Sequence, residues 1–239
     1  MPVLDGQTVV VVGGGSHLGR AIAIAAAAEG ATVVVAGPTE ANVRATAEEI
    51  GGSARPMVTD IADEASIAAL ADAVGSVDHV VCTAAMHANG KLAQVDAAAA
   101  TRAYAAKAVG PLMLAKHLAP RMNAGGSFTF LSGIMGRRFA RGLAVMGATN
   151  AAIIGVAQAL AVEIAPLRVN TIAPGMVDSG VYDGMSPAGR SAMFAGTARR
   201  YPVQRIGEPR DVVEAVMFAM TQSFLTGAVI DVDGGGRLV

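Results

Sequence analysis

Short β-branched runs alternate with alanine-rich stretches from one end of this chain to the other. The runs predict strands at Thr8–Val12, Thr32–Ala36, Ala54–Val58, Val77–Cys82, Ser127–Leu131, Arg168–Ile172 and Ala228–Val232. Several of them are continuously apolar, which is typical of parallel strands that helices cover on both faces. The alternation therefore predicts an α/β fold with a doubly wound parallel sheet of about seven strands and helices on both faces.

The stretches between these runs predict helices near Leu18–Glu29, Glu40–Ile50, Glu64–Val74, Val95–Met122, Gly142–Ala165 and Pro209–Thr221. Glycines fall at the joints, and Pro209 opens the last helix. No linker or charge block divides the chain, so residues 1–239 are predicted to form a single domain. Residues 178–201 carry glycines and a proline, and are predicted to form an irregular lid or substrate loop.

Composition narrows the class of partners. The chain has 18 basic and 19 acidic residues and a net charge of −1, which offers no field for nucleic acid or for an anionic membrane. The uncharged stretch Ala144–Val162 is interrupted by polar residues and glycines, so we interpret it as a buried or interface helix. The single cysteine, Cys82, fits a reducing compartment, and the N-terminus shows no signal-peptide pattern. A cytoplasmic location is the expectation.

A glycine-rich turn follows the first predicted strand. Gly13-Gly14-Gly15-Ser16-His17-Leu18-Gly19 leads directly into a predicted helix. A helix N-terminus presents unpaired N–H groups and partial positive charge, which suit a pyrophosphate, and glycines let the backbone approach it closely. The turn therefore predicts a dinucleotide site outside the carboxyl ends of the strands.

The spacing of this turn resembles the G-x-x-x-G-x-G motif of short-chain dehydrogenase/reductases, with Gly13 first, Gly19 last and His17 in place of the middle glycine. The resemblance covers nearly the whole chain and includes Pro174–Ser179, Arg205–Pro209 and Thr226–Gly235. It implies a Rossmann-type domain that binds NAD or NADP and acts on an unknown small molecule. It also implies a homotetramer or homodimer, which the Ala-, Gly- and Met-rich long helices suit.

The resemblance places cofactor contacts along the strand ends. Asp60 matches the acid that holds the adenine amino group, and Ser179 ends the segment beside the nicotinamide carboxamide. The predicted contacts are Gly13, Gly15, Ser16, His17, Leu18, Gly19, Asp60, Ile61, Ala84, Pro174, Gly175 and Ser179. The second strand leads into Gly37-Pro38, without the acid that holds an NAD ribose, which slightly favours NADP. The His17 ring obstructs the pyrophosphate, pairs with it when protonated, or is a tolerated substitution at the rim of the site, which is the favoured interpretation.

The same resemblance leaves the catalytic positions without their usual residues. The family implies a Tyr proton donor, a Lys four residues later that lowers its pKa, a Ser that polarises the carbonyl and an Asn on the preceding long helix. These positions hold Met146, Asn150, Gly133 and Lys107. Ser132 lies one residue before the Ser position and is predicted to face the other side of the strand, unless the strand end is bulged. General acid catalysis contributes about 10²–10⁴ in rate, so ordinary carbonyl reduction is predicted to be very weak.

Lys107, Tyr182 in the lid and His87 after the fourth strand are candidate substitutes for the proton donor. A further tyrosine, Tyr104, lies one turn before Lys107. Each also has an ordinary structural explanation in packing or solvent exposure. Lys107 and Asn150 exchange the family's Asn and Lys, which suggests that Lys107 supplies positive charge near the cofactor ribose. A chance substitution explains the exchange equally well.

Two other groups of polar residues lie outside these motifs. Arg137, Arg138 and Arg141 form a basic cluster beside the expected substrate mouth, where they bind an anion or simply face solvent or a neighbouring subunit. His79 and His117 have no metal-ligand spacing, so no metal site is predicted.

Three functions remain open on this basis. The first is an atypical NAD(P)-dependent oxidoreductase with a non-standard active site. The second is a catalytically inactive protein, a pseudoenzyme that binds cofactor or ligand and acts through oligomerisation. The third is non-redox chemistry in the same pocket through Lys107 or His87. Family pattern favours the first, whereas the residues at the catalytic positions favour the other two.

Overall fold

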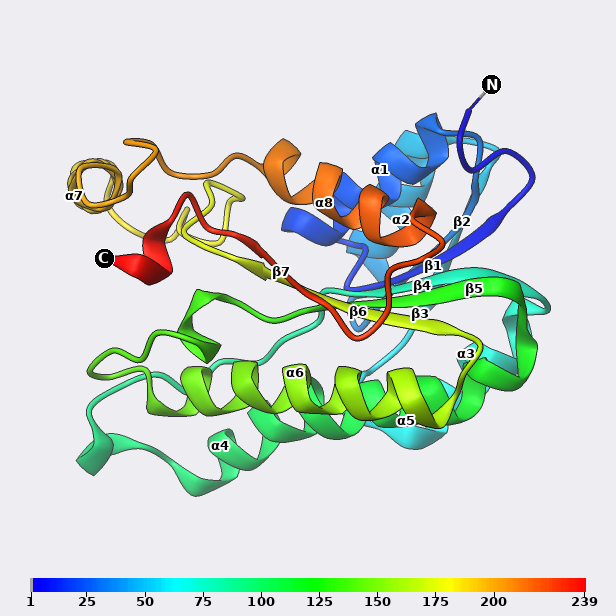
Figure 1. The fold of residues 1–239 in the computed structure, drawn as a ribbon, viewed down its shortest axis with the longest axis horizontal. Coiled ribbons are helices and arrows are strands. Elements are labelled where there is room, and N and C mark those ends of the chain that lie inside the picture. Colours follow the sequence, from blue (N-terminus) through cyan, green and yellow to red (C-terminus); the bar gives the residue numbers. More distant parts are fainter. Residues whose placement is uncertain (1) are drawn as a thin grey trace.

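The computed structural model describes residues 2–239, which form one seven-stranded sheet. The sheet runs through the centre of the molecule (Figure 1). The strands are β1 (Thr8–Val12), β2 (Thr32–Gly37), β3 (Ala54–Val58), β4 (Val77–Cys82), β5 (Met122–Leu131), β6 (Arg168–Pro174) and β7 (Val229–Val232). Every neighbouring pair is parallel, in the order β3-β2-β1-β4-β5-β6-β7. The predicted doubly wound sheet is confirmed.

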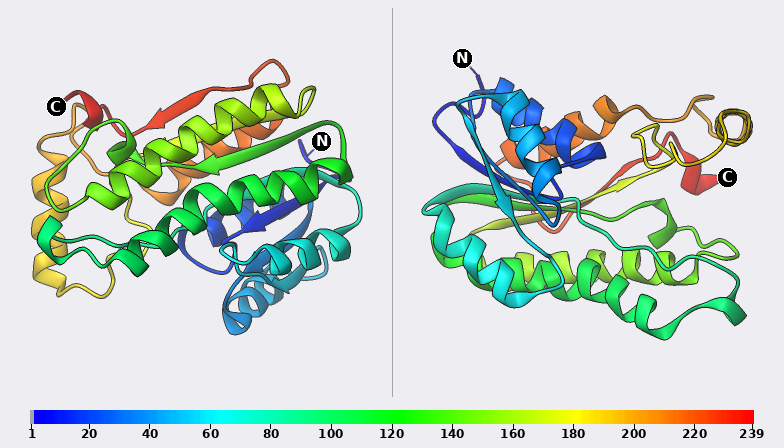
Figure 2. Two further views of the ribbon diagram at one scale, coloured as in Figure 1. Left: turned by 90° about the horizontal axis from the view of Figure 1, so that it is seen from below. Right: turned by 180° about the vertical axis from the view of Figure 1, so that it is seen from behind.

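Helices cover both faces of this sheet (Figures 1 and 2). They are α1 (His17–Ala28), α2 (Glu40–Ile50), α3 (Glu64–Val74), α4 (Ala97–Tyr104), α5 (Gly110–Leu118), α6 (Ala144–Glu163), α7 (Pro187–Ala198) and α8 (Pro209–Thr221). Buried side chains of α3, α5 and α6 form one apolar layer on the sheet. Those of α1, α2 and α8 form the other layer. Both faces are therefore closed to solvent, which explains the continuously apolar strands.

The prediction of one continuous helix over Val95–Met122 is wrong. This stretch is divided into α4, a π-helical turn at Ala105–Val109, and α5, and β5 already begins at Met122. After the π-helical turn, Gly110 packs closely against the segment that follows β3. A Cβ on Gly110 would stand 2.4 Å from the Ile61 carbonyl oxygen. A side chain at this position would collide with the backbone, so the close packing of α5 requires glycine.

Residues 178–201, predicted to form an irregular lid or substrate loop and here called the lid, contain the helix α7, which corrects the prediction of irregular structure. The Ser186 hydroxyl accepts a hydrogen bond from the Gly189 N–H at 3.2 Å and caps the helix, which opens on Pro187. Arg190 pairs with Asp178 and, at 3.0 Å, with Asp183. These contacts order the segment and tie α7 to the chain that leaves β6.

One helix among residues 2–239, α6, is long and apolar enough to cross a bilayer by length and composition alone. A core helix passes the same test, and Ile153, Ala157 and Leu160 of α6 are buried in an apolar layer of this fold. The packing of α6 on the sheet agrees with the predicted buried or interface helix.

Arg168, at the start of β6, gives a test of how the sheet is joined to α8. Its side chain is 8% exposed and donates hydrogen bonds to the carbonyls of Ala219 at 2.8 Å and Met220 at 2.5 Å. Arg168→Met leaves these carbonyls unpaired, so we expect the free energy of unfolding to fall by about 2–3 kcal/mol in urea titrations. Arg210→Met, at an exposed site on the same helix, should change it by less than about 0.5 kcal/mol. Equal effects of the two substitutions would contradict this role.

Candidate functional site

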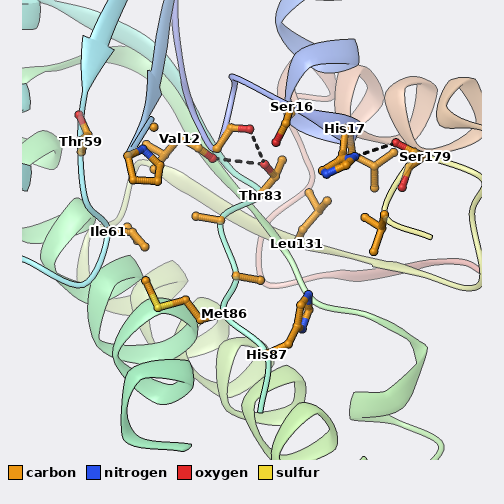
Figure 3. A pocket seen from close by; sticks show the side chains of 18 of the residues that line it. Val12, Ser16, His17, Thr59, Ile61, Thr83, Met86, His87, Leu131 and Ser179 are labelled. Carbon is orange, nitrogen blue, oxygen red and sulfur yellow. Dashed lines mark hydrogen bonds between the residues drawn. The ribbon is translucent and has the colours of Figure 1, made fainter. Parts of the chain in front are cut away.

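Two adjoining cavities lie at the edge of the sheet where the carboxyl ends of the strands meet. The first cavity, of about 280 Å³, is bordered by the glycine turn after β1 and by the residues that follow β2, β3 and β4 (Figure 3). The second cavity, of about 510 Å³, is bordered by the segments after β5 and β6, by α6 and by the lid. The two share the wall residues Leu18, Thr83, Ala85, Met86, His87 and Leu131. A ligand in one therefore lies beside a ligand in the other.

The glycine turn holds α1 against the end of β1. Gly13 has a φ of 89°, in the left-handed region. A Cβ on Gly19 would stand 2.0 Å from the Gly13 carbonyl oxygen, so the first turn of α1 approaches the backbone as only glycine permits. Thr83 donates weakly from its hydroxyl to the Val12 and Gly13 carbonyls, at 3.4 Å each (Figure 3).

Unpaired polar groups face the first cavity. Ser16 precedes α1 but makes no side-chain capping hydrogen bond, so its hydroxyl leaves the N–H groups of the first turn free for an anion. The Thr59 hydroxyl borders the cavity, is buried, and has no hydrogen-bond partner among the described residues. The Asp60 carboxylate lies on the same wall and accepts from the Ala62 N–H at 2.9 Å. This set of donors and acceptors fits a dinucleotide.

His17 connects the glycine turn to the start of the lid. Its φ is 47°, and its Nδ1 lies 3.1 Å from the Ser179 carbonyl oxygen (Figure 3). Because a carbonyl only accepts, Nδ1 carries the proton and donates it. His17 thus has the left-handed backbone conformation that favours glycine, the residue that the family has at this position. Its ring bridges two walls of the first cavity.

The predicted cofactor contacts divide between the cavities. The first is bordered by Gly13, Ser16, His17, Leu18, Gly19, Asp60, Ile61, Ala84 and Ser179. Pro174 and Gly175 border the second. Gly15 borders neither, because it packs on α2, where a Cβ would stand 3.0 Å from that of Asn42. Thr59 and Thr83 were missed by the sequence analysis, although both follow strands that end at this edge.

The four positions of the family's catalytic residues meet in the second cavity. Lys107, Gly133, Met146 and Asn150 all border it. The Asn150 amide lies against Gly133, where a Cβ would stand 2.9 Å from Asn150 Nδ2. The Ser132 hydroxyl also reaches this helix, but it donates to the Asn150 carbonyl at 2.8 Å. Neither a free hydroxyl nor a phenol therefore stands where the family places its Ser and Tyr.

Lys107 lies on the π-helical turn and is 8% exposed. Its Nζ donates one long hydrogen bond, 3.4 Å, to the Ser132 carbonyl. Burial lowers the pKa of this ammonium to about 8, and the charge interaction with the nearby Cys82 raises it by a smaller amount. Lys107 borders the second cavity and not the first, and a position near the cofactor ribose stays a prediction.

The other candidate donors are placed unequally. Tyr182 borders the second cavity, but burial, followed by the neighbouring Tyr201, raises the pKa of its phenol. A raised pKa makes a phenol a weaker acid, opposite to what a proton donor near neutral pH requires. His87 borders both cavities, and desolvation, followed by the charge of Lys107, lowers its pKa. Tyr104 is 40% exposed and borders neither cavity.

The basic cluster lies outside both cavities. Arg137 pairs with Asp231 at 2.7 Å, and Arg138 donates to the Gly236 carbonyl at 3.1 Å, so both are tied to the C-terminal segment. Among residues 2–239, no group of three or more His, Cys, Asp or Glu side chains is placed to hold a metal ion.

Comparison with known proteins adds three findings. The profile of the family described as Enoyl-(Acyl carrier protein) reductase matches residues 13–236. A short-chain dehydrogenase/reductase of Stachybotrys chlorohalonatus is 31% identical over 254 residues, which cover 100% of both chains. A small-chain dehydrogenase solved in complex with NADPH is 36% identical, has a TM-score of 0.86, and covers 98% of this chain and 100% of its own.

Another similar protein is the MalC reductase/Diels-Alderase of Malbranchea aurantiaca. Its structure has a TM-score of 0.92 with this chain at 25% sequence identity, and the match covers 100% of this chain and 99% of that one.

The buried ammonium of Lys107 generates a pH-dependent stability. Below about pH 8 the folded and unfolded states both hold the proton, and the cost of burying the charge is complete. Between about pH 8 and the ordinary value of 10.5, only the unfolded state holds it, so stability rises with pH through this window. We expect Lys107→Met to be more stable than the unsubstituted protein by ~3 kcal/mol at pH 7. The difference should shrink towards pH 10.5.

Chemical denaturation at a series of pH values measures this difference. Lys91→Met, at an exposed lysine, serves as the control and should give no such trend. A constant difference between Lys107→Met and the unsubstituted protein across the window would show that burial does not shift this ammonium.

Proposed function

This chain belongs to the short-chain dehydrogenase/reductase family, and we propose that it binds NADP(H), or NAD(H), along the first cavity and transfers hydride to or from a small molecule in the second. The shared wall of the two cavities carries the proposal, because hydride transfer requires cofactor and substrate in contact. The NADPH complex of a protein 36% identical to this chain supports the choice of cofactor. When bound, the nicotinamide supplies or accepts the hydride.

The residues of the first cavity would hold the two ends of the cofactor. The free N–H groups at the start of α1 suit the pyrophosphate. Thr59 and Asp60, which line this cavity, would contact the adenosine, and Ser179 would contact the nicotinamide. Pro38 stands at the end of β2, where an acid would hold an NAD ribose, so no carboxylate at that point repels a 2′-phosphate. The proposed preference is therefore for NADP.

The reaction in the second cavity departs from the family's proton relay. Met146 has no proton to donate, Asn150 carries no charge, and the Ser132 hydroxyl is engaged with a backbone carbonyl. Lys107 is the cation of this cavity, so negative charge that develops on a substrate would be stabilised by its ammonium. Solvent or the substrate itself would supply the proton.

Two other functions remain as candidates. None of the four catalytic positions holds the family's usual residue, which favours a non-catalytic protein that binds ligand and acts as a homotetramer or homodimer. Val162 on α6, 81% exposed, adds apolar surface for such pairing. The name of the MalC reductase/Diels-Alderase attaches a non-redox activity to a protein of this fold, which favours other chemistry in the second cavity. The buried Cys82 agrees with the proposed cytoplasmic location.

Calorimetric titration with NADPH, NADP⁺, NADH and NAD⁺ tests the proposal. We expect binding of the NADP forms, with weaker binding of the NAD forms. Gly19→Ala should abolish it, because the added Cβ would stand 2.0 Å from the Gly13 carbonyl and displace the start of α1. Gly184→Ala is the control, since its Cβ would meet nothing within 4 Å. Failure of the folded, unsubstituted protein to bind any of the four nucleotides would remove the redox function.

Restoring the missing groups tests the departure from the family's chemistry. We expect Gly133→Ser, Met146→Tyr and Asn150→Lys together to raise NADPH-dependent carbonyl reduction by about 100-fold or more. Met146→Tyr alone should stay near the unsubstituted rate, because the family's lysine four residues later on the helix, which lowers the pKa of the phenol, would still be absent at Asn150. The substitutions must be combined, since a Cβ at Gly133 crowds the Asn150 amide.

NADPH absorbance over a panel of ketones and aldehydes measures both rates. If the unsubstituted protein already reduces them as fast as the triple variant, another proton donor acts in this cavity and the proposed departure is wrong.

A further inference from the structure

The second cavity is an apolar space with one buried cation in its wall. Five methionines line it: Met86, Met135, Met146, Met176 and Met193. Its volume of about 510 Å³ is that of a site for a small molecule. Among the described residues, no aspartate or glutamate lies in this wall. The charge of Lys107 is therefore not offset from within the cavity.

The hydrogen bonding of Lys107 is also incomplete. An ammonium donates three hydrogen bonds, and Lys107 Nζ makes one, to the Ser132 carbonyl at 3.4 Å. That distance is long for a charged donor, which typically lies about 2.7–2.9 Å from its acceptor. The π-helical turn at Ala105–Val109 places this side chain in the wall, and such turns are frequent at functional sites. Two N–H groups of the ammonium thus remain available to a ligand.

The titratable groups around Lys107 add no negative charge near neutral pH. Cys82, on β4, is buried, and its burial raises the pKa of the thiol to about 11. His87 has a lowered pKa and is neutral. The Tyr182 phenol in the lid has a raised pKa, and the Tyr201 hydroxyl accepts a hydrogen bond from the Met176 N–H. A ligand is the available source of a counter-charge.

We propose that the second cavity binds a small apolar molecule carrying one oxyanion, a carboxylate or an enolate, and that Lys107 Nζ binds the oxygen. The methionine side chains would pack on the apolar part of the ligand, because their flexible thioethers adapt to varied shapes. A cationic ligand such as an iminium is excluded by charge repulsion. The proposal names the substrate class of the reaction proposed above and rests on it for the ligand's place beside the cofactor.

Lys107 acting as an amine nucleophile is the alternative that the observations favour less. Nucleophilic attack needs the neutral amine. The long contact to the Ser132 carbonyl and the apolar surroundings would suit that form, but most of the amine is protonated near pH 7. Oxyanion binding uses the protonated form, which predominates near pH 7.

Cinnamate and its neutral isostere cinnamamide test the proposal by calorimetry on the protein without added nucleotide. We expect cinnamate to bind at least about tenfold more tightly than cinnamamide at pH 7. Its affinity should fall by about tenfold per pH unit once the pH exceeds the pKa of Lys107 in the free protein, while that of cinnamamide stays constant. Lys107→Met should remove the preference for cinnamate and keep the binding of cinnamamide. Lys91→Met, outside both cavities, should keep both.

Equal affinity for the two compounds at pH 7, or an undiminished preference in Lys107→Met, would overturn the proposal. Borohydride trapping of cinnamaldehyde on Lys107, measured by mass spectrometry, together with equal affinity for the two compounds, would establish the nucleophile instead. Because these measurements omit nucleotide, preference for cinnamate without any NAD(P) binding would leave the oxyanion site intact and remove only the redox function.

Discussion

The parallel pairing of all seven strands is the constraint on which the rest of this molecule depends. Parallel strands need crossover connections, and the crossover helices bury both faces of the sheet in apolar contacts. Every strand then ends at the same edge, so the turns after β1, β3 and β4 and the segments after β5 and β6 meet there. Both cavities lie along that edge because it is the part of the sheet that helices do not close.

The sheet was predictable because its signal is local. The predicted bounds of β1, β3 and β4 match the observed ones, and β1 is a continuous β-branched run. The π-helical turn inside the predicted helix over Val95–Met122 was not predictable, because it accompanies a tertiary contact between Gly110 and the Ile61 carbonyl. The helix α7 was missed for a related reason. Its cap at Ser186 is a short local signal, but its stability also draws on the ion pairs of Arg190 with two aspartates before the helix.

The candidate site shows the same difference between what local spacing predicts and what tertiary contacts decide. Spacing along β5 and α6 identifies the residues at positions 133, 146 and 150, because register is counted along regular elements. Spacing does not say which atoms face a ligand. The Asn150 amide lies against Gly133, and the Ser132 hydroxyl turns to the Asn150 carbonyl. Arg137 turns away to Asp231. These choices follow from side-chain packing, which a single sequence does not encode in any local pattern.

Lys107 and Met146 differ in polarity from what their positions in the second cavity would suggest, and they differ in opposite directions. At Met146 an apolar side chain stands where a phenol would donate, whereas at Lys107 a charge stands among apolar side chains without a carboxylate partner. A buried, unpaired ammonium costs free energy, and a methionine of similar length would avoid that cost. If position 107 contributed only to packing, an apolar side chain there would give a more stable protein. An anionic ligand changes the balance, because it completes an ion pair of which the protein supplies one half. The stability lost in the free protein is then recovered in binding, since a ligand that binds only the folded state stabilises it by mass action.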